Sequence, residues 1–152
     1  MKNLFDVKGH VVVITGGTGV LGRAIAKYLA EQGAKIAILG RKENVGNAIV
    51  EDIKQNGGEA SFYKTDVMNK EKLIKNREDI LSKYGRIDSL LNAAGGNMKG
   101  ATIGSDQNFF DLDPAQFQTV LNLNLTGTVI PTQVFLEPLV KQGKGTIVNF
   151  SS

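Results

Sequence analysis

The stretch of sequence with the clearest chemical potential is TGGTGVLG, which lies between an apolar run and an amphipathic segment. Gly17, Gly19 and Gly22 have the spacing G-x-G-x-x-G, which at a strand-to-helix turn lets backbone amides and the helix dipole hold a pyrophosphate. Such glycines can also serve the conformation of the turn alone. We favour a dinucleotide site because this is the first turn in a series of alternating strands and helices. The predicted contacts are Gly16, Gly17, Thr18, Gly19, Val20, Leu21 and Gly22.

The end of the second predicted strand is the second chemically informative position. An acidic residue there would hold a ribose 2′-hydroxyl, but this strand ends in Gly40, followed by Arg41 and Lys42. Guanidinium and ammonium groups suit a 2′-phosphate, so the pair predicts NADP in preference to NAD. A solvated charge pair is the alternative interpretation, and Glu43 is the residue that would restore a ribose contact and the use of NAD.

The rest of the chain alternates apolar runs with segments at helical spacing. The runs predict five strands, over residues 11–15, 36–39, 59–66, 86–95 and 145–152. Helices are expected from Val20 to the QGA at 32–34, over 44–58, over 69–85 and over 113–143, with a polar loop at 96–112. Pro131 and Pro138 are expected to kink or break the last helix. This alternation predicts an α/β fold, a Rossmann-type doubly wound parallel sheet in the order 3-2-1-4-5, as one domain over residues 1–152.

Composition excludes several other classes of protein. The chain has 152 residues, 18 of them basic and 15 acidic, and its lysines are dispersed, which argues against a nucleic-acid partner. The sequence has no cysteine, which excludes disulfides and thiolate chemistry and fits the cytoplasm. Its one histidine, His10, precedes the first strand, so no metal site is expected. Charges at Asp6 and Lys8 interrupt the amino-terminal apolar residues, and we expect neither export nor membrane insertion.

Five motifs together resemble the short-chain dehydrogenase/reductase family. They are TGGTGVLG, TDV at 65–67, NAAG at 92–95, NLNLTG at 122–127 and GTIVNFSS at 145–152. The resemblance implies an NAD(P)-dependent oxidoreductase that transfers a hydride between a nicotinamide cofactor and a carbonyl or secondary alcohol. It also implies a small-molecule substrate and, for the complete protein, a homo-oligomer, either a dimer or a tetramer.

The resemblance also assigns roles to individual residues. Asp66 would bind the adenine amino group and Val67 would make the neighbouring backbone contact. Asn92, Ala93, Ala94 and Gly95 would contact the part of the cofactor near its ribose. The catalytic residues would be Asn124, holding a water of a proton relay, and Ser152, hydrogen-bonded to the substrate carbonyl. The alternatives left open are a turn role for Asp66 and an ordinary buried polar role for Asn124.

The chain departs from the family pattern inside the glycine turn. The family spacing T-G-x-x-x-G-x-G would have glycine at position 20, where this chain has Val20. A subgroup acting on sugar acids such as mannonate or fructuronate shares the GGxGVL turn and is similar in the loop and helix that follow Asn92. The polar loop, with Asn97 and Lys99, would suit a hydroxylated carboxylate.

The catalytic Y-x-x-x-K that the family carries on its next helix has no counterpart here. Neither Tyr63 nor Tyr84 has a lysine four positions later. We therefore expect the 152-residue chain by itself to be inactive, either as a truncated part of a reductase or as a nucleotide-binding module without catalysis. An exposed edge at the fifth strand is expected. The helix from Pro114 resembles the oligomer-forming helix of the family, although core packing explains its apolar residues equally well.

Overall fold

The computed structural model describes residues 6–150 and confirms the predicted α/β fold, with five parallel strands in the order β3-β2-β1-β4-β5. Ser151 and the predicted catalytic Ser152 lie outside the described residues. The strands are β1 (Val11–Thr15), β2 (Lys35–Gly40), β3 (Glu59–Lys64), β4 (Ser89–Asn92) and β5 (Thr146–Asn149). The helices are α1 (Val20–Glu31), α2 (Glu43–Gln55), α3 (Lys70–Tyr84), α4 (Pro114–Leu121) and α5 (Gly127–Gln142).

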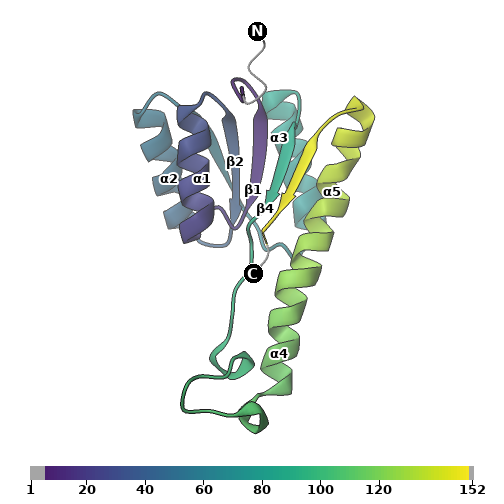
Figure 1. Cartoon of the computed structure of the whole chain (residues 1–152). Coiled ribbons are helices and arrows are strands. Elements are labelled where there is room, and N and C mark those ends of the chain that lie inside the picture. Colours follow the sequence, from purple (N-terminus) through teal and green to yellow (C-terminus); the bar gives the residue numbers. More distant parts are fainter. Residues whose placement is uncertain (1–5, 151–152) are drawn as a thin grey trace.

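Helices cover both faces of the sheet, and β1 shows why (Figure 1). Its side chains alternate, so Val12 and Ile14 face α1 and α2 whereas Val11 and Val13 pack with α3 and α5. All five residues of β1 are buried. A strand buried on both faces reads as a continuous apolar run, which is why this run has no polar alternation.

The packing face of α1 combines small residues with two larger ones. Ile25 and Leu29 pack against the core, whereas Leu21 and Tyr28 are exposed, Tyr28 by 61%. The buried positions are Gly22, Ala26 and Ala30. Small side chains let the helix axis approach the sheet closely, and Ile25 and Leu29 complete the contact beside them.

The predicted long helix from Pro114 is present but is interrupted at a different place. A π-helical turn, η3 (Asn122–Thr126), joins α4 to α5, and the helix then continues through Pro131 and Pro138 to Gln142. The expected break at the prolines was therefore wrong. Both prolines are buried, and we attribute the continuity to packing of α5 against α3 and the sheet, which offsets the two missing backbone hydrogen bonds.

Residues 96–121 form an arm that projects beyond the carboxyl ends of the strands (Figure 1). The arm contains two short 3₁₀ turns, η1 (Lys99–Ala101) and η2 (Phe109–Asp111), and α4. It is closed on itself, because Gly100 N–H donates to Gln116 Oε1 at 3.0 Å and Asp113 N–H donates to the Gly100 carbonyl at 2.9 Å. Phe110, on η2, is 93% exposed.

The β5 edge is open, as expected. Within residues 6–150, β5 pairs only with β4, and Val148 and the adjacent Phe150 are each about two-fifths exposed. Among the described residues, no helix is both long enough and apolar enough to cross a bilayer.

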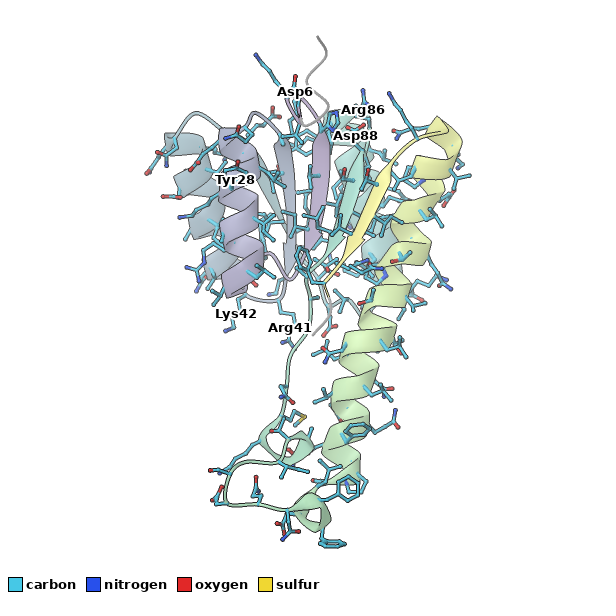
Figure 2. The ribbon with its side chains drawn as sticks, viewed as in Figure 1. Asp6, Tyr28, Arg41, Lys42, Arg86 and Asp88 are labelled. Atoms are coloured by element: carbon cyan, nitrogen blue, oxygen red, sulfur yellow. The ribbon has the colours of Figure 1, made fainter. Side chains whose placement is uncertain are left out.

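A buried carboxylate holds together the end of the sheet opposite the arm. Asp88, just before β4, accepts a hydrogen bond from Val11 N–H at 2.9 Å and pairs with the Arg86 guanidinium. Burial opposes ionisation, but the hydrogen bonds from Arg86 and Val11 outweigh it and hold the pKa of Asp88 below its ordinary value. The ionised form therefore joins β1 to β4 at this end (Figure 2).

Replacing Asp88 with asparagine should lower the free energy of unfolding by about 1–3 kcal/mol at neutral pH, because the Arg86 contact is lost in a buried place. Because the pKa of Asp88 is lowered in the folded state, the difference in free energy of unfolding between the two proteins should reach its maximum above the ordinary pKa of aspartate. It should shrink as pH falls through the lowered native pKa. The measurement is urea denaturation of both proteins across acid pH.

The control for Asp88→Asn is Asp52→Asn. Asp52 forms an exposed ion pair with Lys27 at 2.7 Å, and an exposed pair contributes less than about 1 kcal/mol. An equal loss in both variants, or a difference for Asp88→Asn that does not change with pH, would contradict the proposed role of the buried carboxylate.

Candidate functional site

Two adjoining hollows lie at the carboxyl ends of the strands and share Ala93, Ala94 and Gly95. The first hollow has a volume of about 210 Å³ and the second about 570 Å³. The rest of the first is lined by Gly16, Thr18, Gly19, Leu39, Gly40, Arg41, Lys42, Asp66, Val67 and Leu123. The rest of the second is lined by Leu21, Gly96, Asn97, Asn124 and Phe150. A ligand much longer than either hollow could therefore lie across both.

The glycine turn between β1 and α1 is packed too closely for side chains. Gly16 has a φ of +65°, and a Cβ there would lie 2.6 Å from the Ala93 carbonyl oxygen. A Cβ on Gly22 would lie 2.5 Å from the Gly16 oxygen, and one on Gly17 would lie 2.8 Å from Ile38 Cγ2. These three glycines let the turn, α1 and the loop after β4 approach one another.

The amino terminus of α1 faces the first hollow through Gly19. Gly19 is the N-cap and supplies no side-chain hydrogen bond, so the first amides of α1 are free of a side-chain cap. Val20 stands where the family pattern has glycine, and its side chain is 85% exposed, which explains why a larger residue fits. Free amides and the positive end of the helix dipole make this terminus suitable for an anion.

Two cations lie at the first hollow, at the end of the sheet opposite Asp88 (Figure 2). Within residues 6–150, neither Arg41 nor Lys42 forms a salt bridge. Glu43, which the sequence offered as a ribose contact, instead pairs with Lys64 at 3.1 Å. Two cations are therefore available at this hollow, beside the carboxylate of Asp66.

Asp66 and Val67 also lie where the resemblance places them, at the first hollow. Asp66 Oδ1 accepts a hydrogen bond from Met68 N–H at 2.9 Å, so Asp66 shapes the turn after β3 as well as lining the hollow. The turn role and the site role are therefore compatible. Val67 is buried and helps to form the floor.

Asn92 does not line either hollow, in contrast to its three successors Ala93, Ala94 and Gly95. Its buried side chain donates to Thr132 Oγ1 at 3.0 Å and to Asn149 Oδ1 at 2.9 Å, which joins β4 to α5 and β5. Its Oδ1 has no partner among the described residues. Asn92 thus supports the site by holding β4 against α5 and β5. The expected direct contact of its side chain with the cofactor is not visible in this geometry.

Thr15 is a site-building residue that the sequence analysis missed. It is fully buried at the end of β1, and its Oγ1 accepts a hydrogen bond from Ala94 N–H at 3.2 Å. The loop after β4 is therefore fixed to the end of β1. Thr15 is the first residue of the TGGTGVLG motif, which was the available signal, but only the three-dimensional contact shows which group its hydroxyl binds.

Asn124 clamps the base of the arm. Its Oδ1 accepts from Gly96 N–H at 2.9 Å and its Nδ2 donates to the Gly96 carbonyl at 3.0 Å. Asn124 is exposed at the second hollow and lies in the π-helical turn, so it is not the ordinary buried polar group that was the alternative. Its carbonyl accepts from Thr128 Oγ1 at 2.9 Å.

The two tyrosines considered as substitutes for the missing acid line neither hollow. Burial raises the pKa of Tyr63 to about 12, with a further contribution from Tyr84. Burial likewise raises the pKa of Tyr84, whose hydroxyl lies 2.7 Å from Ser61 Oγ. Both therefore hold their protons tightly on the α3 side of the sheet.

Residues 10–152 match the family described as short chain dehydrogenase. The chain belongs to this family.

Relatives in this family extend well beyond the length of this chain. An uncharacterized oxidoreductase of Bacillus subtilis, UxuB, is 41% identical over 97% of the chain and 56% of the relative. A solved structure of a candidate D-mannonate oxidoreductase from Haemophilus influenza, with bound NAD, is 36% identical with a TM-score of 0.86. The match covers 96% of this chain and 56% of the chain in that structure. A solved structure of a metagenomic short-chain oxidoreductase in complex with NADP is 26% identical, with a TM-score of 0.82. The match covers 97% of this chain and 64% of the metagenomic protein. The chain spans about half the length of the relatives it matches.

Replacing Gly16 with alanine should destabilise the chain by more than about 2 kcal/mol, because a strained φ and a backbone clash act together. Gly57→Ala is the control. Gly57 has a φ of +80°, but a Cβ there would meet no atom within 4 Å, so Gly57→Ala should lower the free energy of unfolding by only about 1–2 kcal/mol. Equal losses in chemical denaturation would show that the contact with Ala93 contributes nothing.

Replacing Asn124 with alanine should free the Gly96 amide without unfolding the chain. Loss of one net hydrogen bond, worth about 1 kcal/mol, should raise amide hydrogen exchange at Gly96 roughly fivefold. Asn122→Ala is the control, because Asn122 lies on the same turn but its side chain is hydrogen-bonded, within residues 6–150, only to Gln118, at 3.0 Å. Unchanged exchange at Gly96 in Asn124→Ala would rule out the clamp.

Proposed function

We propose that this chain is the dinucleotide-binding part of an NAD(P)-dependent oxidoreductase. The observation that carries the proposal is the uncapped amino terminus of α1, which faces a hollow with two unpaired cations at its rim. Amides and the helix dipole suit a pyrophosphate, and the close packing that the glycines allow brings this helix terminus to the loop after β4. The residues present therefore fit a nicotinamide dinucleotide.

The two hollows give the proposed cofactor a direction. The adenosine half would lie in the first hollow, against Asp66, Val67 and Arg41, and the nicotinamide half would lie toward the second, near Asn124. When bound, the cofactor supplies hydride transfer to or from a carbonyl or secondary alcohol carbon. The chain orients it, while Leu21 and Phe150 contribute apolar surface to the second hollow.

We propose NADP as the preferred cofactor. Gly40 offers no carboxylate to a ribose 2′-hydroxyl, Glu43 is held by Lys64, and Arg41 is free for a 2′-phosphate. The two structures compared above hold NAD in one case and NADP in the other, so both cofactors occur in the family. The charge at the rim of this chain supports the phosphorylated one.

For the substrate we propose a sugar acid such as mannonate or fructuronate. Similarity to the candidate D-mannonate oxidoreductase supports this class, and Asn97 brings a polar side chain to the second hollow. Ser152 would hydrogen-bond the substrate oxygen and Asn124 would hold a water nearby. A general acid would have to come from outside residues 6–150, because neither described candidate, Tyr63 or Tyr84, lies at the hollows.

A nucleotide-binding module without catalysis remains the second candidate function, because it needs the hollows but no acid. For either function we propose a homo-oligomer in the cytoplasm, acting on or binding a small molecule. Exposed apolar side chains recur along α4, η3 and α5 and would be covered by association. They are Phe117, Leu121, Leu125, Val129, Leu136 and Val140.

Replacing Arg41 with alanine should weaken NADPH binding about tenfold or more and leave NADH binding nearly unchanged, because a charge-assisted contact to the extra phosphate is lost. Fluorescence titration of the chain with each nucleotide is the measurement. Lys54→Ala is the control, since Lys54 is an exposed cation on α2 that pairs with Glu51, at 3.2 Å. Tighter binding of NADH than NADPH would overturn the NADP preference, and no binding of either would overturn the dinucleotide site.

A further inference from the structure

The side chain of Thr18 lies directly over Gly40. A Cβ placed on Gly40 would lie 2.8 Å from both Thr18 Cγ2 and Thr18 Oγ1, and 3.4 Å from Thr18 Cβ. Gly40 is buried and has no positive φ, so its backbone does not itself demand glycine. The reason for glycine at the end of β2 is therefore the threonine above it.

Rotation of Thr18 would not remove this contact. Its two γ atoms occupy two of the three staggered positions around Cβ, and both are equally close to position 40. Because threonine always fills two of three positions, every rotamer leaves at least one γ atom over position 40. Serine fills only one position and can turn its hydroxyl away, whereas valine fills two as threonine does.

The backbone at Gly40 cannot move aside cheaply either. β2 is paired on both sides, with β1 and β3, and Thr65 N–H donates to the Gly40 carbonyl at 2.9 Å. Gly17 N–H donates to the Leu39 carbonyl at 3.2 Å, which ties the end of β2 to the glycine turn that carries Thr18. The threonine and the strand end are thus held at a fixed separation.

We propose that Thr18 is a specificity-determining residue of the dinucleotide site, because it occupies the space that an acidic side chain at position 40 would need to hold a ribose 2′-hydroxyl. The inference rests on the proposed function. In this inference Thr18, a residue of the glycine turn, prevents a carboxylate at position 40 from binding the ribose 2′-hydroxyl of NAD. Arg41 and Lys42 then remain as the groups at the ribose end of the hollow.

The steric part is tested without any nucleotide. Gly40→Ala adds only the Cβ and should lower Tm by about 3 °C or more in the wild-type and T18V backgrounds, as expected for overpacking in a chain of this size. In the T18S background the same substitution should change Tm by less than half as much. An equal loss in all three backgrounds would overturn the steric inference.

The specificity part is tested by NADH titration of the same full chain. G40D alone and T18V/G40D should bind NADH no more tightly than the wild type, whereas T18S/G40D should bind it about tenfold more tightly, because only there can the carboxylate reach the ribose. T18S alone is measured as the reference for T18S/G40D, and T119S, the same change on α4 at a residue that lines neither hollow, is the matched control, which should leave NADH affinity within about twofold of the wild type. A gain in G40D equal to that in T18S/G40D, or no gain in T18S/G40D, would overturn the role of Thr18.

These outcomes are distinguishable from failure of the proposed function. If the wild-type chain and every variant bind neither NADH nor NADPH, the dinucleotide site itself is wrong and the specificity role of Thr18 falls with it. The Tm comparison still decides whether the threonine and the strand end form a steric pair. If the wild type binds NADPH but the double variant gains no NADH affinity, only the inference about Thr18 fails.

Discussion

The close approach of the glycine turn to the loop after β4 is the contact on which the site depends. Gly16 lies so near Ala93 that any side chain would overlap the backbone, and Gly22 lies equally close to Gly16. Thr15 Oγ1, at the end of β1, accepts a further hydrogen bond from Ala94 N–H. These contacts bring the first amides of α1 beside the floor made by residues 93–95. Two β–α connections from different parts of the chain thereby share one cleft.

The two ends of the sheet are held by different chemistry. At the amino ends of the strands, ionised Asp88 joins β1 to β4 by accepting a hydrogen bond from Val11 N–H and pairing with Arg86. At the carboxyl ends the chain uses glycines, short side chains and backbone contacts, which leave amides and cations available. This division matches the general rule that ligands of open parallel sheets bind beyond the carboxyl ends of the strands.

Much of this architecture could be predicted from the sequence, because strands buried on both faces and helices ended by glycine leave local signals. Gly85 and Gly143 do adopt the left-handed conformation that ends α3 and α5. Features that depend on distant partners could not be predicted. Asn92 turns toward Thr132 and Asn149 rather than the cleft. The π-helical turn and the intact helix through Pro131 likewise depend on tertiary packing.

The clamp between Asn124 and Gly96 has a mechanical consequence. The arm joins the domain through only two segments, the loop after β4 and the helix that continues into α5, and this clamp links them at the root (Figure 1). The loop after β4 and this helix therefore cannot separate at the root of the arm without breaking these two hydrogen bonds, and the residue that makes them also lines the second hollow.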